Sequence, residues 1–376
     1  MRNQCIICIL LLFFSTNCFA GASPQESLPP LPIRERVIKV PLSDGTDMSV
    51  VFMLPHFARE RYPLVIFNPG TPQDASVNSD FALSHNYGTY YFLSRGYAVA
   101  VPIMRGYAGT GGRRIARGCD QAAMGIDMAR DIKQVADFLL RIPAFAGRPH
   151  VVAGLSMGGW NSFAYASLAP RGLAGVVSFA GGLRAIGCAD DRSVDALRAY
   201  GRTAGVPSLW VFGSNDSIFP RSKFSDMFAA WSSGAAHGTW LDIGRLGNDS
   251  HMLLHVPSAI GLWSARVDAF LGSVGMPSAV LDAGYLPTPV PNGAPWDGAS
   301  LPKRFLSSPS TATLLSEYGR FSKPKALALG RGGTSTIVSG GFDPIAASLA
   351  KCRSAGDTCS LWLVDDMVVG DASFWR

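Results

Sequence analysis

The residue best suited to do chemistry is Ser156, which lies between Gly154 and Gly158 in a Gly-x-Ser-x-Gly pattern. An apolar run at 151–153 precedes the pattern, and a helix-like run at 160–168 follows it. A serine on a sharp turn from strand to helix has a strained backbone, so both flanking positions must lack side chains. The pattern predicts a catalytic nucleophile at Ser156; the alternative is a glycine-rich packing turn.

A serine nucleophile needs an acid and a base elsewhere in the chain. The hydroxyl is weakly nucleophilic at neutral pH, so a histidine must take its proton and a carboxylate must orient the histidine. On a strand–turn–helix scaffold these partners follow the serine in the order acid, then base. Asp216 directly follows the apolar run at 209–212 and is the predicted acid. Asp190 and Asp191 are the alternatives, with loop or helix-capping roles otherwise.

Six histidines compete for the role of base. The required order excludes the three histidines that come before Ser156 in the chain: His56, His85 and His150. His237 falls before the last predicted strand, at 239–243. His251 lies on the loop after that strand and is the predicted base. His255, in the helix that follows, is the alternative.

An oxyanion forms during acyl transfer and needs hydrogen-bond donors. The first predicted donor is the backbone N–H of Met157, the residue after the nucleophile. The second is expected from the loop after the apolar run at 64–67, where Gly70 permits a sharp turn that aims the Thr71 amide inward. The alternative for this loop is a turn that only ends the strand.

The elements that must position these residues form a repeating strand–helix pattern. Alternating segments at 37–40 and 48–54 predict an antiparallel hairpin around Asp44-Gly45. Later strands are predicted from nearly continuous apolar runs at 64–67, 98–103, 151–153, 176–179, 209–212 and 239–243. Helical spacing is clearest at 122–140. The pattern predicts an α/β fold, with a mostly parallel sheet between two helical layers.

Several of these pieces together carry a family resemblance. The loop at 68–71, the loop at 105–111, the turn at Ser156, the Asp216 loop and His251 resemble those of the α/β hydrolases. More narrowly, they are similar to exported members of the dienelactone-hydrolase-like group. The resemblance implies the α/β-hydrolase fold and a serine hydrolase that works without a cofactor.

Two departures bear on the substrate that the resemblance implies. The resemblance covers roughly residues 35–273. The first departure is that the founding dienelactone hydrolases use cysteine where this chain has Ser156. Asn68-Pro69 also replaces the His-Gly pair common in relatives. The predicted function is therefore a carboxylic-ester hydrolase with a small-molecule ester substrate, rather than a lactone-specific enzyme.

Two other functions remain as alternatives. A serine peptidase or aminopeptidase of the prolyl-oligopeptidase type resembles this catalytic layout, but such enzymes usually carry a large propeller domain before the hydrolase part. A non-catalytic binding protein of the cell envelope would keep the fold and use its C-terminal part. The presence of nucleophile, acid and base together favours an enzyme over the binding protein.

The first residues predict export. Arg2 precedes an apolar run at 6–14, and the small residues Ala20 and Ala22 offer cleavage sites, so 1–22 is a predicted signal peptide. Cleavage would leave the mature protein periplasmic or secreted; the alternative is an uncleaved anchor. No later segment approaches the roughly 20 apolar residues of a membrane-spanning helix.

The cysteine pattern also favours export. Three of the seven cysteines leave with the predicted signal, and four remain. Four thiols allow three pairings, and proximity favours Cys352 with Cys359 and Cys119 with Cys188. In an oxidising compartment such pairs are structural disulfides. The chain has no zinc-binding spacing, so no metal site is predicted.

The composition is that of a folded protein with a sizeable core. Of 376 residues, 48% are hydrophobic and 16% are charged, which is unlike a disordered chain. The net charge of +6 comes from scattered basic residues without a nucleic-acid-binding motif, so nucleic acid is not a predicted partner.

Shifts in composition predict the domain organisation. The last part has apolar runs at 326–329 and 361–369 around a helix-like run at 344–351, which predicts a small strand–helix–strand module. Because a module this short buries only a small core, a disulfide and docking on the main domain would help it fold. The predicted parts are a signal peptide at 1–22, a linker at 23–35, an α/β-hydrolase domain at 36–275, a Pro/Gly-rich connector at 276–324 and a disulfide-clipped C-terminal α+β module at 325–376.

Overall fold

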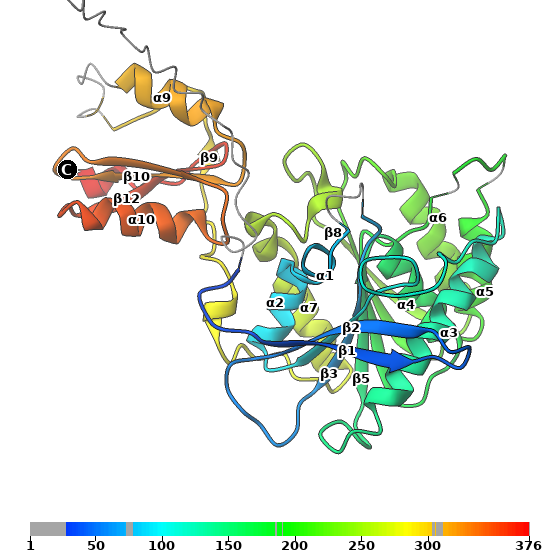
Figure 1. Cartoon of the computed structure of the whole chain (residues 1–376). Helices are drawn as coiled ribbons and strands as arrows, with labels where there is room; N and C mark the ends of the chain where they lie inside the picture. The colour runs from blue at the N-terminus through cyan, green and yellow to red at the C-terminus, as the bar shows by residue number, and fades with distance from the viewer. Residues whose placement is uncertain are drawn as a thin grey trace, which may run out of the picture.

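The chain forms two sheets that stand side by side. The computed structural model describes residues 28–72, 78–184, 186–189, 191–302, 305 and 311–375. An eight-stranded sheet holds most of the chain, and a five-stranded sheet forms near the C-terminus (Figure 1). The predicted signal peptide at 1–22 lies outside the described residues.

The chain enters the large sheet through an antiparallel hairpin. β1 (Arg34–Pro41) pairs along its whole length with β2 (Asp47–Leu54). The turn between them contains Asp44 and Gly45, and Gly45 has a φ of 83°, in the left-handed region that glycine enters without strain. This is the hairpin that the alternating pattern predicts.

The other strands of the large sheet run parallel to one another. They are β3 (Leu64–Asn68), β4 (Ala98–Pro102), β5 (His150–Leu155), β6 (Leu173–Phe179), β7 (Pro207–Phe212) and β8 (His237–Asp242). The order across the sheet is β1-β2-β4-β3-β5-β6-β7-β8, and β2 pairs antiparallel with β4. β3, β4 and β5 are buried at every residue, as continuous apolar runs require of strands covered on both faces. The predicted mostly parallel α/β sheet is confirmed.

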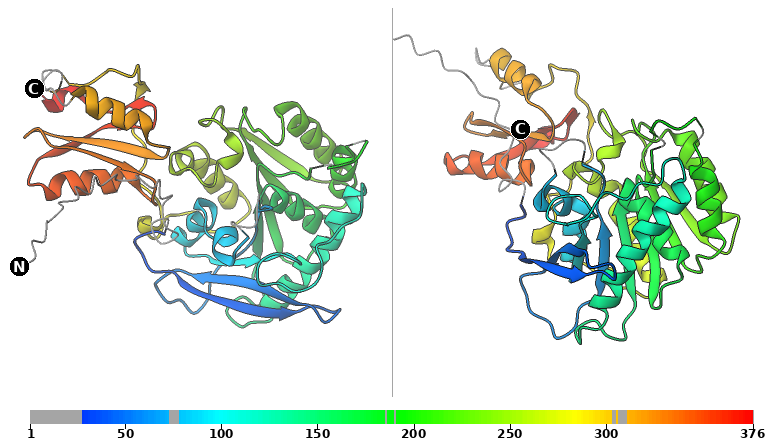
Figure 2. Two further views of the ribbon diagram at one scale, coloured as in Figure 1. Left: turned by 45° about the horizontal axis from the view of Figure 1, so that its top comes forward. Right: turned by 45° about the vertical axis from the view of Figure 1, so that its right-hand side comes forward.

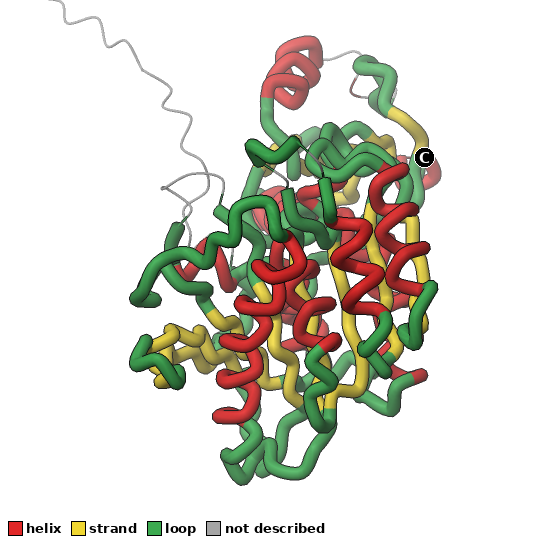
Figure 3. Tube along the Cα trace, turned by 90° about the vertical axis from the view of Figure 1, so that its right-hand side faces the viewer, coloured by secondary structure: helices red, strands yellow, loops and turns green. Residues whose placement is uncertain are grey.

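Helices cover both faces of this sheet. They are α1 (Asp80–Ser84), α2 (Tyr87–Ser94), α3 (Gln121–Leu139), α4 (Met157–Ser167), α5 (Ser193–Gly201), α6 (Arg221–Ser232) and α7 (Ile260–Ser273). α2 and α7 lie on one face, and α3 to α6 lie on the other, the face toward the viewer in Figure 3. α3 is the helix predicted at 122–140, and the Asp120 carboxylate caps it by accepting a hydrogen bond from the Ala123 amide. None of the described helices is long and apolar enough to cross a membrane.

The five-stranded sheet belongs to a C-terminal module that is larger than the sequence pattern indicates. Its elements are β9 (Ala294–Pro295), α9 (Thr311–Arg320), β10 (Lys325–Gly330), β11 (Ser335–Ser339), α10 (Pro344–Ser354), β12 (Cys359–Val364) and β13 (Met367–Val368). The strand order is β11-β10-β12-β13-β9. β9 and α9 lie within 276–324, which we predicted to be an extended connector. A two-residue strand exists only through its pairing with β13, so no local periodicity announces it.

The module packs a small core and carries one of two disulfides. Its buried residues include Tyr318, Leu327 and Trp362. The structure joins Cys352 in α10 to Cys359 in β12. A second disulfide joins Cys119 to Cys188, between the loop before α3 and the loop after β6. These are the two pairings that proximity in the sequence favours.

Candidate active site

Ser156 occupies the sharp turn between β5 and α4. Its backbone has φ 54° and ψ −122°, a strained conformation for a residue with a side chain. Neighbouring backbone holds it there, because the Ser156 amide donates to the Phe179 carbonyl at 2.9 Å. The Ser156 carbonyl accepts from the amides of Trp160 and Gly182, both at 3.1 Å. The strained backbone of Ser156 is therefore held by hydrogen bonds to α4, to β6 and to the loop that follows β6.

The glycines around Ser156 are required by close backbone approach. A Cβ atom at Gly158 would lie 1.9 Å from the Asn68 carbonyl oxygen. A Cβ atom at Gly154 would lie 2.3 Å from the backbone of Gly158. Since non-bonded carbon contacts below about 3.5 Å are repulsive, neither position accepts a side chain. This is the steric reason for the Gly-x-Ser-x-Gly pattern.

Asp216 and His251 form a hydrogen-bonded pair at the same edge of the sheet. The Asp216 Oδ2 atom lies 2.9 Å from His251 Nδ1. The other carboxylate oxygen, Oδ1, accepts from the amides of Ile218 and Phe219, both at 2.8 Å. The Asp216 side chain is fully buried and that of His251 is 10% exposed. A carboxylate fixed in this way orients the ring so that Nδ1 carries the proton and Nε2 remains an acceptor.

Asp249 fastens the loop of the acid to the loop of the base. Its carboxylate accepts hydrogen bonds from the Ser217 amide at 3.0 Å, the Ser217 hydroxyl at 2.6 Å and the His251 amide at 2.9 Å. Burial alone would raise the pKa of Asp249, but these hydrogen bonds hold it below its usual value. Sequence reasoning missed this residue, because no sequence pattern reports a contact between the loops after β7 and β8.

Ser156 and His251 line one large cavity. Its volume is about 1120 Å³, and Met157 and Thr71 also contribute to its wall. Within the described part of the chain, no hydrogen bond joins the Ser156 hydroxyl to the His251 ring. In structures without substrate such catalytic hydrogen bonds are often long, and they form fully in the complex.

Met157 and Thr71, the residues of the two predicted oxyanion donors, lie next to each other beside Ser156. Met157 is the first residue of α4, so its N–H has no partner within the helix. A Cβ atom at Gly70 would come 3.4 Å from the Ser156 Cβ, so the loop after β3 lies directly against the turn. The Thr71 hydroxyl contacts the Met157 sulfur at 3.2 Å. Four of the five predicted site residues therefore line the cavity, and the fifth, Asp216, is buried behind His251 and hydrogen-bonded to it.

The alternatives to the predicted acid and base lie elsewhere or at the rim. Asp191 accepts from the Ser193 amide at 3.0 Å and forms an ion pair with Lys223, so it caps the start of α5. Asp190 lies outside the described residues. His255 is exposed and lines the same cavity as His251. Asp191 therefore does not contact His251, whereas His255 remains near the site.

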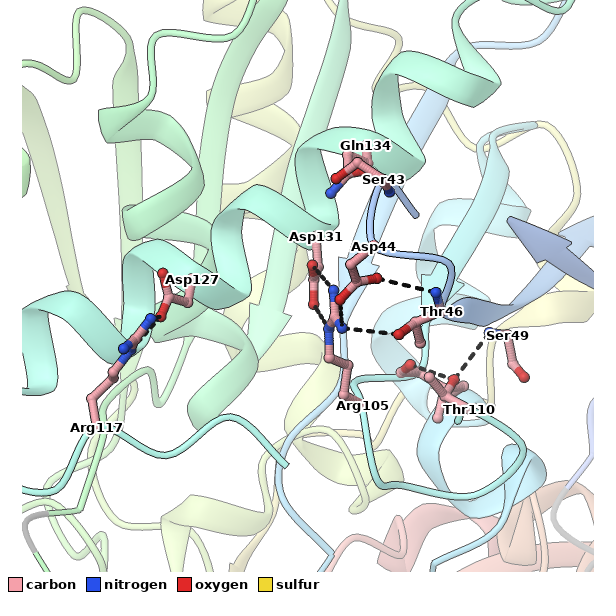
Figure 4. A network of polar contacts seen from close by, with 11 residues as sticks. Ser43, Asp44, Thr46, Ser49, Arg105, Thr110, Arg117, Asp127, Asp131 and Gln134 are labelled. Carbon is pink, nitrogen blue, oxygen red and sulfur yellow. Dashed lines mark hydrogen bonds and ion pairs between the residues drawn. The ribbon is translucent and has the colours of Figure 1, made fainter. Parts of the chain in front are cut away.

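The loop at 105–118 forms another wall and is anchored at its start by Arg105. This guanidinium binds the Asp131 carboxylate of α3 through two hydrogen bonds, at 2.5 and 2.7 Å. It also pairs with Asp44 and donates to the Thr46 hydroxyl at 3.0 Å, so it connects α3 to the β1–β2 turn (Figure 4). The hydrogen bond from Arg105 is the main cause that lowers the pKa of Asp44 to about 2.

The lining of the cavity combines basic and apolar side chains. Arg114, Arg117 and Arg184 belong to it, and the described lining residues include no carboxylate. Arg117 is paired with Asp127. The remainder of the lining is largely aromatic and aliphatic, as is typical of small-molecule sites. No group of three or more His, Cys, Asp or Glu side chains among the described residues has the geometry of a metal site.

The strand order and the turn at Ser156 together decide the fold. A serine at the sharp turn after β5, in a mostly parallel sheet with the predicted acid and base on the loops after β7 and β8, matches the layout of the α/β hydrolases. The chain has the α/β-hydrolase fold. The small antiparallel module is appended to it.

Comparisons with known proteins gave structural likenesses only. No family model matches the chain, and no curated protein matches it. Among solved structures, an esterase of Pyrococcus furiosus has 14% identity and a TM-score of 0.48. The match covers 68% of this chain and 96% of the esterase chain. A Pyrococcus horikoshii acylaminoacyl peptidase has 13% identity and a TM-score of 0.48, covering 65% and 42%. A candidate dienelactone hydrolase of Klebsiella pneumoniae has 18% identity and a TM-score of 0.44, covering 64% and 99%.

Proposed function

We propose that the protein is a serine hydrolase that cleaves carboxylic esters of small molecules. The observation that carries the proposal is the 2.9 Å hydrogen bond between Asp216 and His251, beside a cavity that Ser156 also lines. A serine in a strained turn, a histidine oriented by a buried carboxylate and two adjacent amides are the parts that acyl transfer requires.

In the first half of the reaction, the Ser156 hydroxyl oxygen attacks the ester carbonyl carbon and His251 Nε2 accepts the hydroxyl proton. The carbonyl oxygen becomes an oxyanion that accepts hydrogen bonds from the amides of Met157 and Thr71. Met157 is at the N-terminus of α4, where the helix dipole also favours negative charge. The tetrahedral intermediate then collapses, the alcohol leaves with the proton from His251, and an acyl-enzyme remains.

In the second half, a water molecule replaces the alcohol. His251 takes a proton from this water, whose oxygen attacks the acyl carbon. The same two amides stabilise the second oxyanion, and Ser156 recovers its proton as the carboxylic acid leaves. Asp216 stabilises the imidazolium in both halves, and it does so without changing position because two amides hold its other oxygen.

We also propose that the protein works outside the cytoplasm, in the periplasm or after secretion. The predicted signal peptide at 1–22 and the four remaining cysteines support this location. The disulfides Cys119–Cys188 and Cys352–Cys359 account for all four. Such bonds persist in oxidising compartments and are rare in the cytosol.

The test uses the purified mature protein with p-nitrophenyl esters, aminoacyl p-nitroanilides and a fluorophosphonate that labels activated serines. We expect ester turnover and a single label on Ser156, and both should disappear in Ser156→Ala. Ser167→Ala, at the other end of α4, is the matched control and should retain both. Cleavage of the anilides without the esters would indicate a peptidase. If the protein shows no turnover and no labelling, the proposal is overturned in favour of a binding protein.

A further inference from the structure

The C-terminal module supplies part of the wall of the candidate active site. Gly340 and Gly341, which we call the glycine turn, lie between β11 and α10 and line the same cavity as Ser156 and His251. Pro324, directly before β10, lines it too. Figures 1 and 2 show the small sheet standing beside the part of the large domain that carries α2. A segment far from the nucleophile in sequence therefore borders the reacting groups' cavity.

The residue after the glycine turn is the anchor that holds the module there. Phe342 is only 5% exposed and packs in the core of the large domain rather than in the module's own core. Its ring centroid lies 5.6 Å from that of Tyr87 and 5.7 Å from that of Tyr90, both in α2. The Tyr87 hydroxyl also donates to the Phe342 carbonyl at 2.7 Å. The position of the turn is thus set by contacts with the large domain.

The backbone of the turn is constrained on both sides. Gly340 and Gly341 have φ values of 79° and 80°, so both need the conformational freedom of glycine. The Gly340 amide donates to the Pro324 carbonyl at 2.7 Å. On the other side, the Asp343 carboxylate accepts from the Thr288 amide and hydroxyl, both at 2.7 Å. At this place the wall of the cavity is therefore backbone without side chains, held in position by hydrogen bonds on both sides.

Tyr87 and Tyr90, which pack against Phe342 beside the glycine turn, also line the cavity. The Tyr87 amide donates to the Leu254 carbonyl at 2.9 Å, which ties α2 to the segment that carries His251. Tyr87 and Leu254 both line the cavity. Since Arg114 and Arg184 also line it while the turn contributes no charge, an uncharged group of a substrate fits best at the turn.

We propose that the glycine turn closes a subsite for an apolar group of the substrate, so that the C-terminal module selects esters that carry a chain-sized or ring-sized apolar group. The inference rests on the proposed function. A cavity of about 1120 Å³ slightly exceeds the usual volume of sites for drug-sized ligands, and it is far larger than a short ester fills. A substrate that reaches from Ser156 to the turn gains binding energy at both ends.

The test compares three esters by pH-stat titration: ethyl acetate, ethyl octanoate and 2-phenylethyl acetate. The last two enlarge the acyl side and the alcohol side without making the leaving alcohol much more acidic than ethanol. In the wild-type protein we expect kcat/KM to be on the order of tenfold higher, or more, for at least one large ester than for ethyl acetate. This measurement does not depend on any variant folding.

The variants are Gly340→Asn and Gly341→Asn, because asparagine tolerates positive φ better than most residues. Either change adds a side chain at the turn, and at least one should lower kcat/KM for the preferred large ester by on the order of tenfold. Ethyl acetate should change by about twofold or less. Gly356→Asn is the matched control, since Gly356 also has a φ of 80° in the same module and open space around its Cβ.

The outcomes separate this inference from the proposed function. If ethyl acetate is hydrolysed and Ser156→Ala abolishes its hydrolysis, the proposed function holds whatever the turn variants do. No preference for either large ester in the wild type, or equal losses on all three esters in both turn variants, overturns the inference alone. A wild type that hydrolyses none of the three and resists the fluorophosphonate overturns both.

Discussion

The large sheet domain and the C-terminal module contribute to the same cavity in different ways. The large domain supplies side chains and amides at the ends of β3, β5, β7 and β8, which hydrogen bonds and steric contacts hold in place. The module supplies two glycines and a proline, and its own core is small. In the proposed function, the reacting groups therefore lie on loops fixed to the strand ends, and the module can restrict the size of the substrate without moving them.

The largest effect should separate the catalytic role of the large domain from everything else. Ser156→Ala or His251→Ala is expected to lower ester turnover by on the order of 10⁴ or more, because the nucleophile or its base is lost. Melting of both regions should be unchanged. Ser167→Ala and His255→Ala serve as controls in the same assay. A greater loss in His255→Ala than in His251→Ala would reassign the base.

A somewhat smaller effect is expected from the acid. Asp216→Asn keeps the shape of the side chain but replaces a charge that orients the His251 ring, so kcat should fall on the order of 10³–10⁴-fold. Asp191→Asn, which alters a carboxylate at the start of α5, should leave kcat near the wild-type value. Similar rates for the two variants would contradict the assignment of Asp216.

The two regions should also differ in their response to pH. Burial lowers the pKa of His150, in β5, to about 4, so the unfolded chain binds a proton between about pH 6.5 and 4 that the folded chain does not. The large domain should therefore lose stability as the pH falls through this window, by on the order of 3 kcal/mol. The module follows the last histidine of the chain, His255, and has no such contribution.

Denaturant unfolding at several pH values checks this expectation. The fluorescence or circular dichroism of the large domain should show a midpoint that falls between pH 6.5 and 4 in the wild type. In His150→Gln, which removes the titrating ring, the curve should be flatter over the same window. An unchanged slope in this variant would show that other groups cause the loss of stability.

The smallest effect should be confined to the module. Replacing Cys352 and Cys359 by serine is expected to lower the stability of the module by about 2 kcal/mol, because the unfolded chain gains freedom. Limited proteolysis should then cut the module first, while turnover of ethyl acetate persists. The comparison is the double replacement Cys119→Ser and Cys188→Ser. It removes the disulfide that ties two loops of the cavity wall, so KM should rise as well.

The sequence predicts the large sheet well, because its inner strands are buried on both faces and show as apolar runs. Each of the eight predicted strands is present, and the helix predicted at 122–140 is α3. The turn at Ser156 is equally visible, because its glycine pattern directly follows an apolar run, although the atoms that exclude a side chain at Gly158 belong to Asn68 and Pro69. Chain order alone then led to Asp216 and His251, which the structure brings within 2.9 Å of each other.

The module was less predictable for physical reasons. β11 (Ser335–Ser339) is short and polar at its ends, and β9 consists of two residues that depend on pairing with β13. Asp249 gave no motif, because its role is to connect two loops that are distant in the chain. Such features arise from contacts between segments, and single-segment periodicity carries no information about them.

The alternation of strands and helices, the Gly-x-Ser-x-Gly pattern and the order of the predicted nucleophile, acid and base can all be read from the amino-acid sequence. The alternation follows from the periodicity of each segment, and the order follows from the one-way path of the chain through a parallel sheet. The docking of Phe342 in the core of the large domain, and with it the place of the glycine turn at the cavity, emerges only from contacts between distant segments. Docking depends on two surfaces matching in shape, and neither surface is encoded in a single stretch of residues.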